Sequence, residues 1–277
     1  MRSRLIALPL FAAGLALAGC APHAGGPAGP GAPRPAPGLR LHVETFRTLA
    51  PRRVRTLVVV LHGDAAPGTR GDELAFAAAS QQAVPDSAAV TILRPGYSDA
   101  KGNKSPGDPG NATGDSYDAP RLADVERTIA RLRAAYPRAR VVLVGDDGGA
   151  AIAANLAGLH PALVDGIVLA GCPCSLPEWR AHMAKRTGNK AWSAATASLD
   201  PLKTAGGVSP ALRAAVLVGA DDPLIPVRFA RAYAESLVLR GVATDYRILP
   251  GKGHDLLGDP EVLAATVRLA ASLPEKR

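Results

Sequence analysis

The stretch Val141–Asn155 constrains the fold more than any other part of this sequence. It begins with valine and leucine, as a buried strand does, and it ends with an alanine-rich run, Ala150–Leu159, that reads as a helix. The run between them, Gly145-Asp146-Asp147-Gly148-Gly149, leaves room only for a tight turn, because a side chain on its first or last glycine would collide where strand and helix come closest. We therefore expect Asp147 to be exposed on a strained turn at a helix N-terminus, where backbone N–H groups favour negative charge.

Apolar runs and amphipathic segments alternate from about residue 54 to the end of the chain. Several runs are nearly all apolar, which is typical of strands buried on both faces of a parallel sheet. This alternation predicts a doubly wound, mostly parallel α/β sheet, in which ligands bind beyond the C-terminal ends of the strands. The expected strands are Leu39–Phe46, Arg55–Leu61, Ala88–Leu93, Val141–Val144, Val164–Ala170, Ala214–Gly219 and Thr244–Leu249, and the expected helices include Leu122–Tyr136, Ala150–Leu159, Pro226–Arg240 and Pro260–Leu273.

Residues suited to catalysis follow four of these strands. His62-Gly63-Asp64 comes first, then Asp147 between its glycines, then Asp222, and last His254. A residue on a strained turn, a carboxylate and an imidazole therefore occur in the order in which some hydrolases carry their nucleophile, acid and base.

With these four motifs, each at a strand end, the chain resembles the α/β-hydrolase fold superfamily over roughly residues 40–275. The stretch Arg94–Tyr97 is similar to that of small esterase- or peptidase-like members. The resemblance implies that Asp147 takes the nucleophile position, that His254 is the general base, and that Asp222 orients His254, with Asp221 as second choice. It also implies that the backbone N–H groups of Asp64 and Gly148 form the oxyanion hole, and it leaves His62 as a brace for this loop.

The residue at the turn departs from the family, which usually has serine there, and three hypotheses follow. In the first, the scaffold acts on small esters or amides, and Asp147 reduces or abolishes activity, because carboxylate attack on an ester would give an anhydride. In the second, Asp147 is a nucleophile toward an sp3 carbon, as in the similar haloalkane dehalogenases and epoxide hydrolases. These enzymes typically carry a tryptophan after the nucleophile or tyrosines in the lid, whereas this chain has Gly148 and no tyrosine in 171–212. In the third, the chain is an inactive binding protein.

Two carboxylates beside one imidazole favour its charged form, so we expect the pKa of His254 to lie above its ordinary value of about 6.5. Substrate choice is expected to reside in the loop Ser98–Pro120 and in a small lid, 171–212. The chemistry needs a small-molecule substrate and no cofactor, and the cysteines lack the spacing of a metal site. Whether Cys172 and Cys174 form a disulfide stays open.

The N-terminus predicts export and lipid anchoring. Basic residues precede the apolar run Leu5–Leu17, which is too short to span a bilayer. Leu17-Ala18-Gly19-Cys20 resembles the lipobox of bacterial lipoproteins, which implies a signal peptide over 1–19 and a lipidated Cys20. A Pro/Gly/Ala-rich tether follows over 20–38, and the hydrolase domain spans 39–277. We expect a lipid-anchored protein of the bacterial cell envelope, on the outer membrane or the periplasmic face.

The net charge of +8 does not indicate a nucleic-acid partner. The basic residues alternate with acidic ones along the chain, as they do on solvated surfaces, and no aromatic residues are interleaved with them as stacking platforms. The membrane, reached through the anchor at Cys20, is the one macromolecular partner that the sequence predicts.

Overall fold

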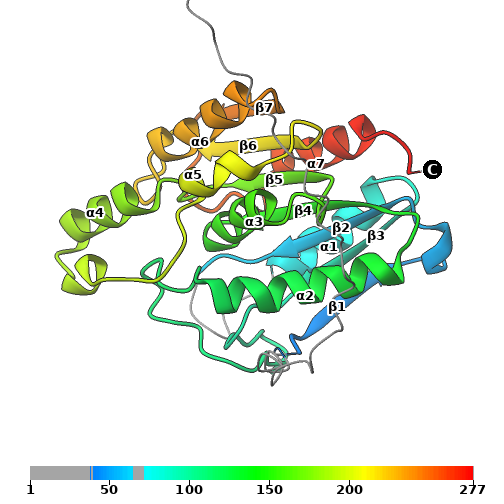
Figure 1. The fold of residues 1–277 in the computed structure, drawn as a ribbon, viewed down its shortest axis with the longest axis horizontal. Coiled ribbons are helices and arrows are strands. Elements are labelled where there is room, and N and C mark those ends of the chain that lie inside the picture. The colour runs from blue at the N-terminus through cyan, green and yellow to red at the C-terminus, as the bar shows by residue number, and fades with distance from the viewer. Residues whose placement is uncertain (1–37, 39, 65–71, 277) are drawn as a thin grey trace, which may run out of the picture. The chain divides into compact units, whose positions relative to one another are not determined.

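The computed structural model describes residues 38, 40–64 and 72–276, and within them one sheet of seven strands runs in the order β1-β3-β2-β4-β5-β6-β7 (Figure 1). Every neighbouring pair from β3 to β7 is parallel, whereas β1 pairs antiparallel with β3. This confirms the predicted doubly wound, mostly parallel α/β class. The strands are β1 (Val43–Arg47), β2 (Thr56–Leu61), β3 (Ser87–Ile92), β4 (Arg140–Asp146), β5 (Gly166–Ala170), β6 (Arg213–Gly219) and β7 (Ala243–Leu249).

Helices cover both faces of the sheet, and the alternation of side chains along each strand supplies a core to each face. In β2, Val59 packs into the larger core with α2, α3 and α6, whereas Val58 and Val60 pack into a second core with α1 and α7. The α-helices are α1 (Asp72–Ala83), α2 (Ala119–Ala135), α3 (Gly148–Leu159), α4 (Leu176–Thr187), α5 (Pro201–Thr204), α6 (Val227–Leu239) and α7 (Pro260–Ser272). Three short 3-10 helices are η1 (Pro51–Arg53), η2 (Lys190–Ser193) and η3 (Ala205–Gly207).

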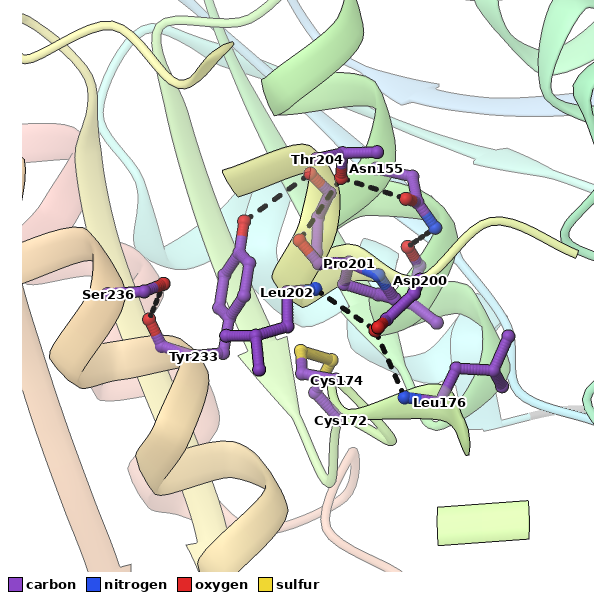
Figure 2. The surroundings of a disulfide bond; sticks show 12 residues. Asn155, Cys172, Cys174, Leu176, Asp200, Pro201, Leu202, Thr204, Tyr233 and Ser236 are labelled. Carbon is purple, nitrogen blue, oxygen red and sulfur yellow. Dashed lines mark hydrogen bonds between the residues drawn. A yellow bond between two sulfur atoms is a disulfide. The ribbon is translucent and has the colours of Figure 1, made fainter. Parts of the chain in front are cut away.

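The predicted lid, 171–212, contains α4, η2, α5 and η3 between β5 and β6. A disulfide joins Cys172 and Cys174 at its start, which settles the question that the sequence left open (Figure 2). The Asp200 carboxylate accepts hydrogen bonds from the backbone N–H groups of Leu176 and Leu202, and so it fastens the beginning of α4 to α5 (Figure 2). The lid therefore has a fixed anchor beside the disulfide.

A buried arginine ties the lid to the long loop that precedes α2. Arg180 of α4 donates to the carbonyl oxygen of Thr113 at 2.8 Å and to that of Ala194 at 2.7 Å. The two segments that we expect to govern substrate choice are thus in direct contact.

None of the helices that the structure describes is both long enough and apolar enough to pass through a membrane. Cys20 and all of residues 1–37 lie outside the described part of the chain. The signal peptide, the tether and the lipid anchor therefore stay predictions.

Candidate active site

The turn between β4 and α3 holds Asp147 in a backbone conformation that side chains rarely adopt, with φ 48° and ψ −115°. Its glycines make this geometry possible. A Cβ atom on Gly145 would lie 2.5 Å from Ala150 Cα, and one on Gly149 would lie 2.5 Å from the carbonyl oxygen of His62. Because α3 packs this closely on β4 and β2, the surrounding structure imposes the strain on Asp147.

The carboxylate of Asp147 occupies the N–H groups that we expect to form the oxyanion hole. The backbone N–H of Asp64 donates to Asp147 Oδ2 at 2.9 Å, and the backbone N–H of Gly148 also hydrogen bonds this carboxylate. Burial and the nearby Asp64 carboxylate raise the pKa of Asp147, while His254 and the two N–H groups partly oppose the increase. One oxygen of the side chain is therefore held before a substrate arrives.

Asp222 and His254 form the predicted acid–imidazole pair. His254 Nδ1 lies 3.0 Å from Asp222 Oδ2, and Asp222 Oδ1 accepts the backbone N–H groups of Leu224 at 2.8 Å and Ile225 at 2.9 Å. Burial opposes ionisation of Asp222, but these hydrogen bonds and His254 keep its pKa below the ordinary value. The neighbouring Asp221 is exposed, so the geometry favours Asp222.

His254 carries a proton near neutral pH. Burial lowers its pKa, but the hydrogen bond that His254 donates to Asp222 and the negative charges of Asp147, Asp222 and Asp146 outweigh this effect and raise the pKa to about 9. The direction is the one expected from two carboxylates flanking one imidazole. Removing the charge of either carboxylate would favour release of this proton.

The side chain of Asp64 belongs to a buried network that the sequence did not reveal. Arg94 Nη1 donates to Asp64 Oδ1 at 2.7 Å, and the hydroxyl of Tyr117 donates to Asp64 Oδ2 at 2.5 Å. Arg94 also donates to the carbonyl oxygens of His62 and Gly63 and to the hydroxyl of Ser116. The guanidinium thereby fixes the loop that presents the Asp64 N–H to Asp147. Arg94 stands in the stretch Arg94–Tyr97, but nothing in that stretch signals where its side chain points.

His62 braces the same loop. Its Nε2 accepts the backbone N–H of Arg94 at 2.9 Å, so the proton sits on Nδ1, which donates to the carbonyl oxygen of Gly63 at 2.9 Å. Both ring nitrogens are used in holding backbone, as the sequence interpretation proposed for this histidine.

A cleft of about 360 Å³ opens over the turn. Three of the predicted site residues line it: Asp64 after β2, Asp147 after β4 and His254 after β7. Asp222 is not among the lining residues and contacts the cleft through His254. Of the loop Ser98–Pro120, the described lining includes only Ala112. The residues that line the cleft are Gly63, Asp64, Asp72, Glu73, Ala112, Asp146, Asp147, Trp179, Met183, Trp192, Leu224, His254, Asp255 and Leu257.

One group of side chains outside this cleft is spaced for a metal ion. Among the described residues, His42, Glu44 and Asp99 bring one possible ligand atom each within 4.8 Å of one another. Protein donors already serve the two acids, because Lys101 Nζ lies 2.8 Å from Glu44 Oε1 and the Asp99 carboxylate accepts three hydrogen bonds from Lys101 and Asn103. These contacts indicate that the acidic side chains stabilise the loop over residues 99–103.

Comparison with known proteins agrees with this fold. Known solved structures share the fold, including Est1E from Butyrivibrio proteoclasticus with ferulic acid bound (10% identity, TM-score 0.62, 84% of this chain and 94% of that one) and a thermostable carboxyl esterase from Bacillus coagulans (14%, 0.60, 86% and 99%). Another is the esterase Pf2001 from Pyrococcus furiosus (13%, 0.62, 84% and 86%). No curated protein matches the sequence. The family described as the alpha/beta hydrolase fold matches residues 92–271, and the chain belongs to that family.

Proposed function

We propose that this chain is a hydrolase that opens an electrophilic sp3 carbon centre, such as an epoxide, through a covalent ester of Asp147. The observation that carries the proposal is the seating of the Asp147 carboxylate: its Oδ2 accepts the backbone N–H of Asp64, and the carboxylate also accepts the backbone N–H of Gly148. A carboxylate seated in this way leaves its other oxygen for attack, and an ionised carboxylate needs no base to activate it.

In the first step, the unbound oxygen of Asp147 attacks the carbon of the epoxide, and the carbon–oxygen bond of the ring breaks. The departing oxygen takes the proton of His254, which carries one at neutral pH. Asp147 becomes a neutral ester, so its charge no longer stabilises the imidazolium. His254 is left neutral and able to act as a base.

In the second step, His254 takes a proton from water as the water oxygen adds to the carboxyl carbon of Asp147. The negative charge then develops on Oδ2, the oxygen that the backbone N–H of Asp64 already holds, beside the N–H of Gly148, which also hydrogen bonds this carboxylate. When the intermediate collapses, the alkoxide of the product leaves and takes the proton of the hydroxyl that water supplied. A diol is released, and both side chains return to their starting charges.

The surroundings of Gly148 favour an epoxide, whose oxygen takes a proton as the ring opens, over a haloalkane, which releases a halide. A Cβ atom on Gly148 would lie 2.7 Å from the hydroxyl of Tyr117 and against the carboxylate of Asp64. The tryptophan that dehalogenases typically carry at this position therefore cannot be accommodated, and an epoxide is the better probe.

Oxygen-18 labelling tests the proposal directly. The purified protein is given styrene oxide, 1-chlorohexane and 4-nitrophenyl acetate in turn, and a single turnover is run in labelled water. We expect diol release, with the label entering the peptide that contains Asp147 and not the diol. The His254→Gln variant lacks both the proton donor of the first step and the base of the second, so it should release no diol, and Asp147→Asn should form neither adduct nor product. Diol labelled directly by the water would refute the ester route.

A second candidate is an ester or amide hydrolase with reduced activity, and the likeness to esterases favours it. In that case the carboxylate blocks the oxyanion hole, and the parent chain turns over 4-nitrophenyl acetate weakly or not at all. A serine in place of Asp147 distinguishes this candidate from the first, because it should restore ester turnover only on a serine-hydrolase scaffold. Silence of every variant on every substrate would leave a binding protein.

We also propose that the chain is anchored to the cell envelope through lipid on Cys20. The support is the motif Leu17-Ala18-Gly19-Cys20 at the end of the apolar run. A single acyl chain binds a membrane only marginally, so stable anchoring requires the several chains that a lipoprotein carries.

A further inference from the structure

We propose that the substrate of this cleft carries an organic cation, a substituted ammonium group. The inference rests on the proposed function only in taking the cleft as the substrate site. It follows from two walls of different chemistry that face the same space: a floor of carboxylates at the strand ends and an aromatic wall from the lid.

The floor is acidic although the chain as a whole has a net charge of +8. Among the described lining residues, His254 is the one basic side chain, and Arg94 balances Asp64 from behind. An excess of negative charge concentrated in a concave site raises the local concentration of cations. The six carboxylates that line the cleft are those of Asp64, Asp72, Glu73, Asp146, Asp147 and Asp255.

The aromatic wall consists of Trp179 of α4 and Trp192 of η2, and Met183 of α4 lines the cleft with them. The two indole rings meet edge to face, with centroids 5.0 Å apart and an interplanar angle of 87°. The indole N–H of Trp179 donates to the carbonyl oxygen of Leu224 at 3.0 Å, so the orientation of this ring is fixed. Tryptophan gives the strongest attraction of an aromatic face for a cation.

The combination fits an organic cation better than a metal ion. The acids stand on separate elements: the β2 end, the start of α1, the β4 turn and the loop after β7. In the described part of the chain, the three side chains gathered closely enough for a metal are His42, Glu44 and Asp99, outside this cleft. Indole rings do not ligate metals, whereas aromatic faces and carboxylates together recognise quaternary ammonium groups.

Binding can be measured without turnover. The chain has two tryptophans, and both line the cleft, so intrinsic fluorescence reports on this site alone. We expect (2-hydroxyethyl)trimethylammonium to bind the wild-type protein at least tenfold more tightly than its uncharged isostere, 3,3-dimethylbutan-1-ol. Raising the salt concentration should lower the affinity for the cation and leave the affinity for the alcohol unchanged. Equal affinities for the two compounds would overturn the inference.

Variants separate the two walls. Asp72→Asn combined with Asp255→Asn removes two exposed carboxylates at the rim of the cleft. This double variant should lower the affinity for the cation several-fold and leave the affinity for the alcohol unchanged. Trp192→Leu should lower the affinity for the cation about tenfold, as measured by calorimetry. Glu235→Gln is the matched control, since it removes an exposed carboxylate of α6 that does not line the cleft. If the Asp72→Asn, Asp255→Asn double variant binds the cation as tightly as this control does, the carboxylates of the cleft do not attract the cation.

Turnover separates this inference from the proposed function. We expect 2,3-epoxypropyl-trimethylammonium to be hydrolysed with a KM at least tenfold below that of 1,2-epoxy-4,4-dimethylpentane, its uncharged isostere. Selective binding of the ammonium compounds with no diol would sustain the cation site and refute the Asp147 chemistry. Equal hydrolysis of both epoxides would sustain the chemistry and refute the cation site.

Discussion

The carboxylate at position 147 accepts hydrogen bonds from the backbone N–H groups of Asp64 and Gly148, the first of them on Oδ2. Replacing Asp147 by serine should free these donors and place a hydroxyl beside His254. We expect hydrolysis of 4-nitrophenyl acetate to rise on the order of 100-fold above the parent, the usual worth of an oxyanion hole. Asp147→Asn is the control, because it keeps the shape and supplies no hydroxyl.

The titration of His254 is the second test at this scale. The histidine should show a pKa of about 9 by NMR in the parent protein. In Asp147→Asn one of the charges that hold its proton is gone, so the pKa should fall toward 6.5. A parent imidazole that is already neutral at pH 6 would contradict the proposed step in which His254 gives up a proton.

The raised pKa of His254 should make the free energy of unfolding depend on pH. The pKa of His254 is higher in the folded state than its ordinary value of 6.5, so its contribution is fully present below pH 6.5 and is lost as the pH rises through 9. The free energy of unfolding, measured in urea, should therefore fall across this window. His254→Gln should flatten the fall, whereas substituting the exposed and unrelated His160 should leave it unchanged.

At the scale of elements, the glycines of the turn set how closely α3 approaches the sheet. A methyl group on Gly149 would press on the backbone of Leu61 and His62 at the end of β2. We expect Gly149→Ala to lower the free energy of unfolding by about 1–3 kcal/mol, as overpacking does. Gly206→Ala is the control, since a Cβ there meets nothing within 4 Å; equal stability of the two variants would show that the packing is looser.

Periodicity and strand-end motifs were enough to predict most of the sheet. The expected strand Ala214–Gly219 differs by one residue from β6 (Arg213–Gly219), and the expected closing helix Pro260–Leu273 differs by one from α7. These elements have strong patterns, because buried parallel strands tolerate little but apolar residues. The antiparallel pairing of β1 did not follow, since no local pattern specifies the partner of an edge strand.

Two parts of the structure escaped prediction for physical reasons. Helix α1 buries Phe76, Ala77 and Ser80 of an alanine- and glutamine-rich segment, which forms too weak an apolar stripe to be recognised. The link from Arg94 to Asp64 depends on side chains far apart in sequence, and a lone arginine reads as a surface residue. Only the fold shows that it is buried.

At the scale of the whole molecule, charge is distributed unevenly. A basic chain presents an acidic cleft at the strand ends, and the two tryptophans of the predicted lid line it. The proposed cation site uses this acidic cleft, whereas the net positive charge of the chain suits the proposed location near anionic lipid headgroups. The proposed substrate class and the proposed envelope location are therefore electrostatically compatible in one molecule.

The proposed lipid anchor is separable from the folded domain. The described core begins at Leu41, so a chain starting at residue 39 should unfold at the same temperature as the full chain and keep the same kinetics. Cys20→Ser in the full chain should abolish acylation, detected by mass spectrometry of the N-terminal peptide, and should move the protein out of the membrane fraction in a bacterial host. Substituting Cys172 and Cys174 together is the control, because these residues are paired within the fold and their loss should leave acylation intact. If the Cys20→Ser protein stays in the membrane fraction, lipid on Cys20 is not what holds it there, and a basic surface patch becomes the feature to test.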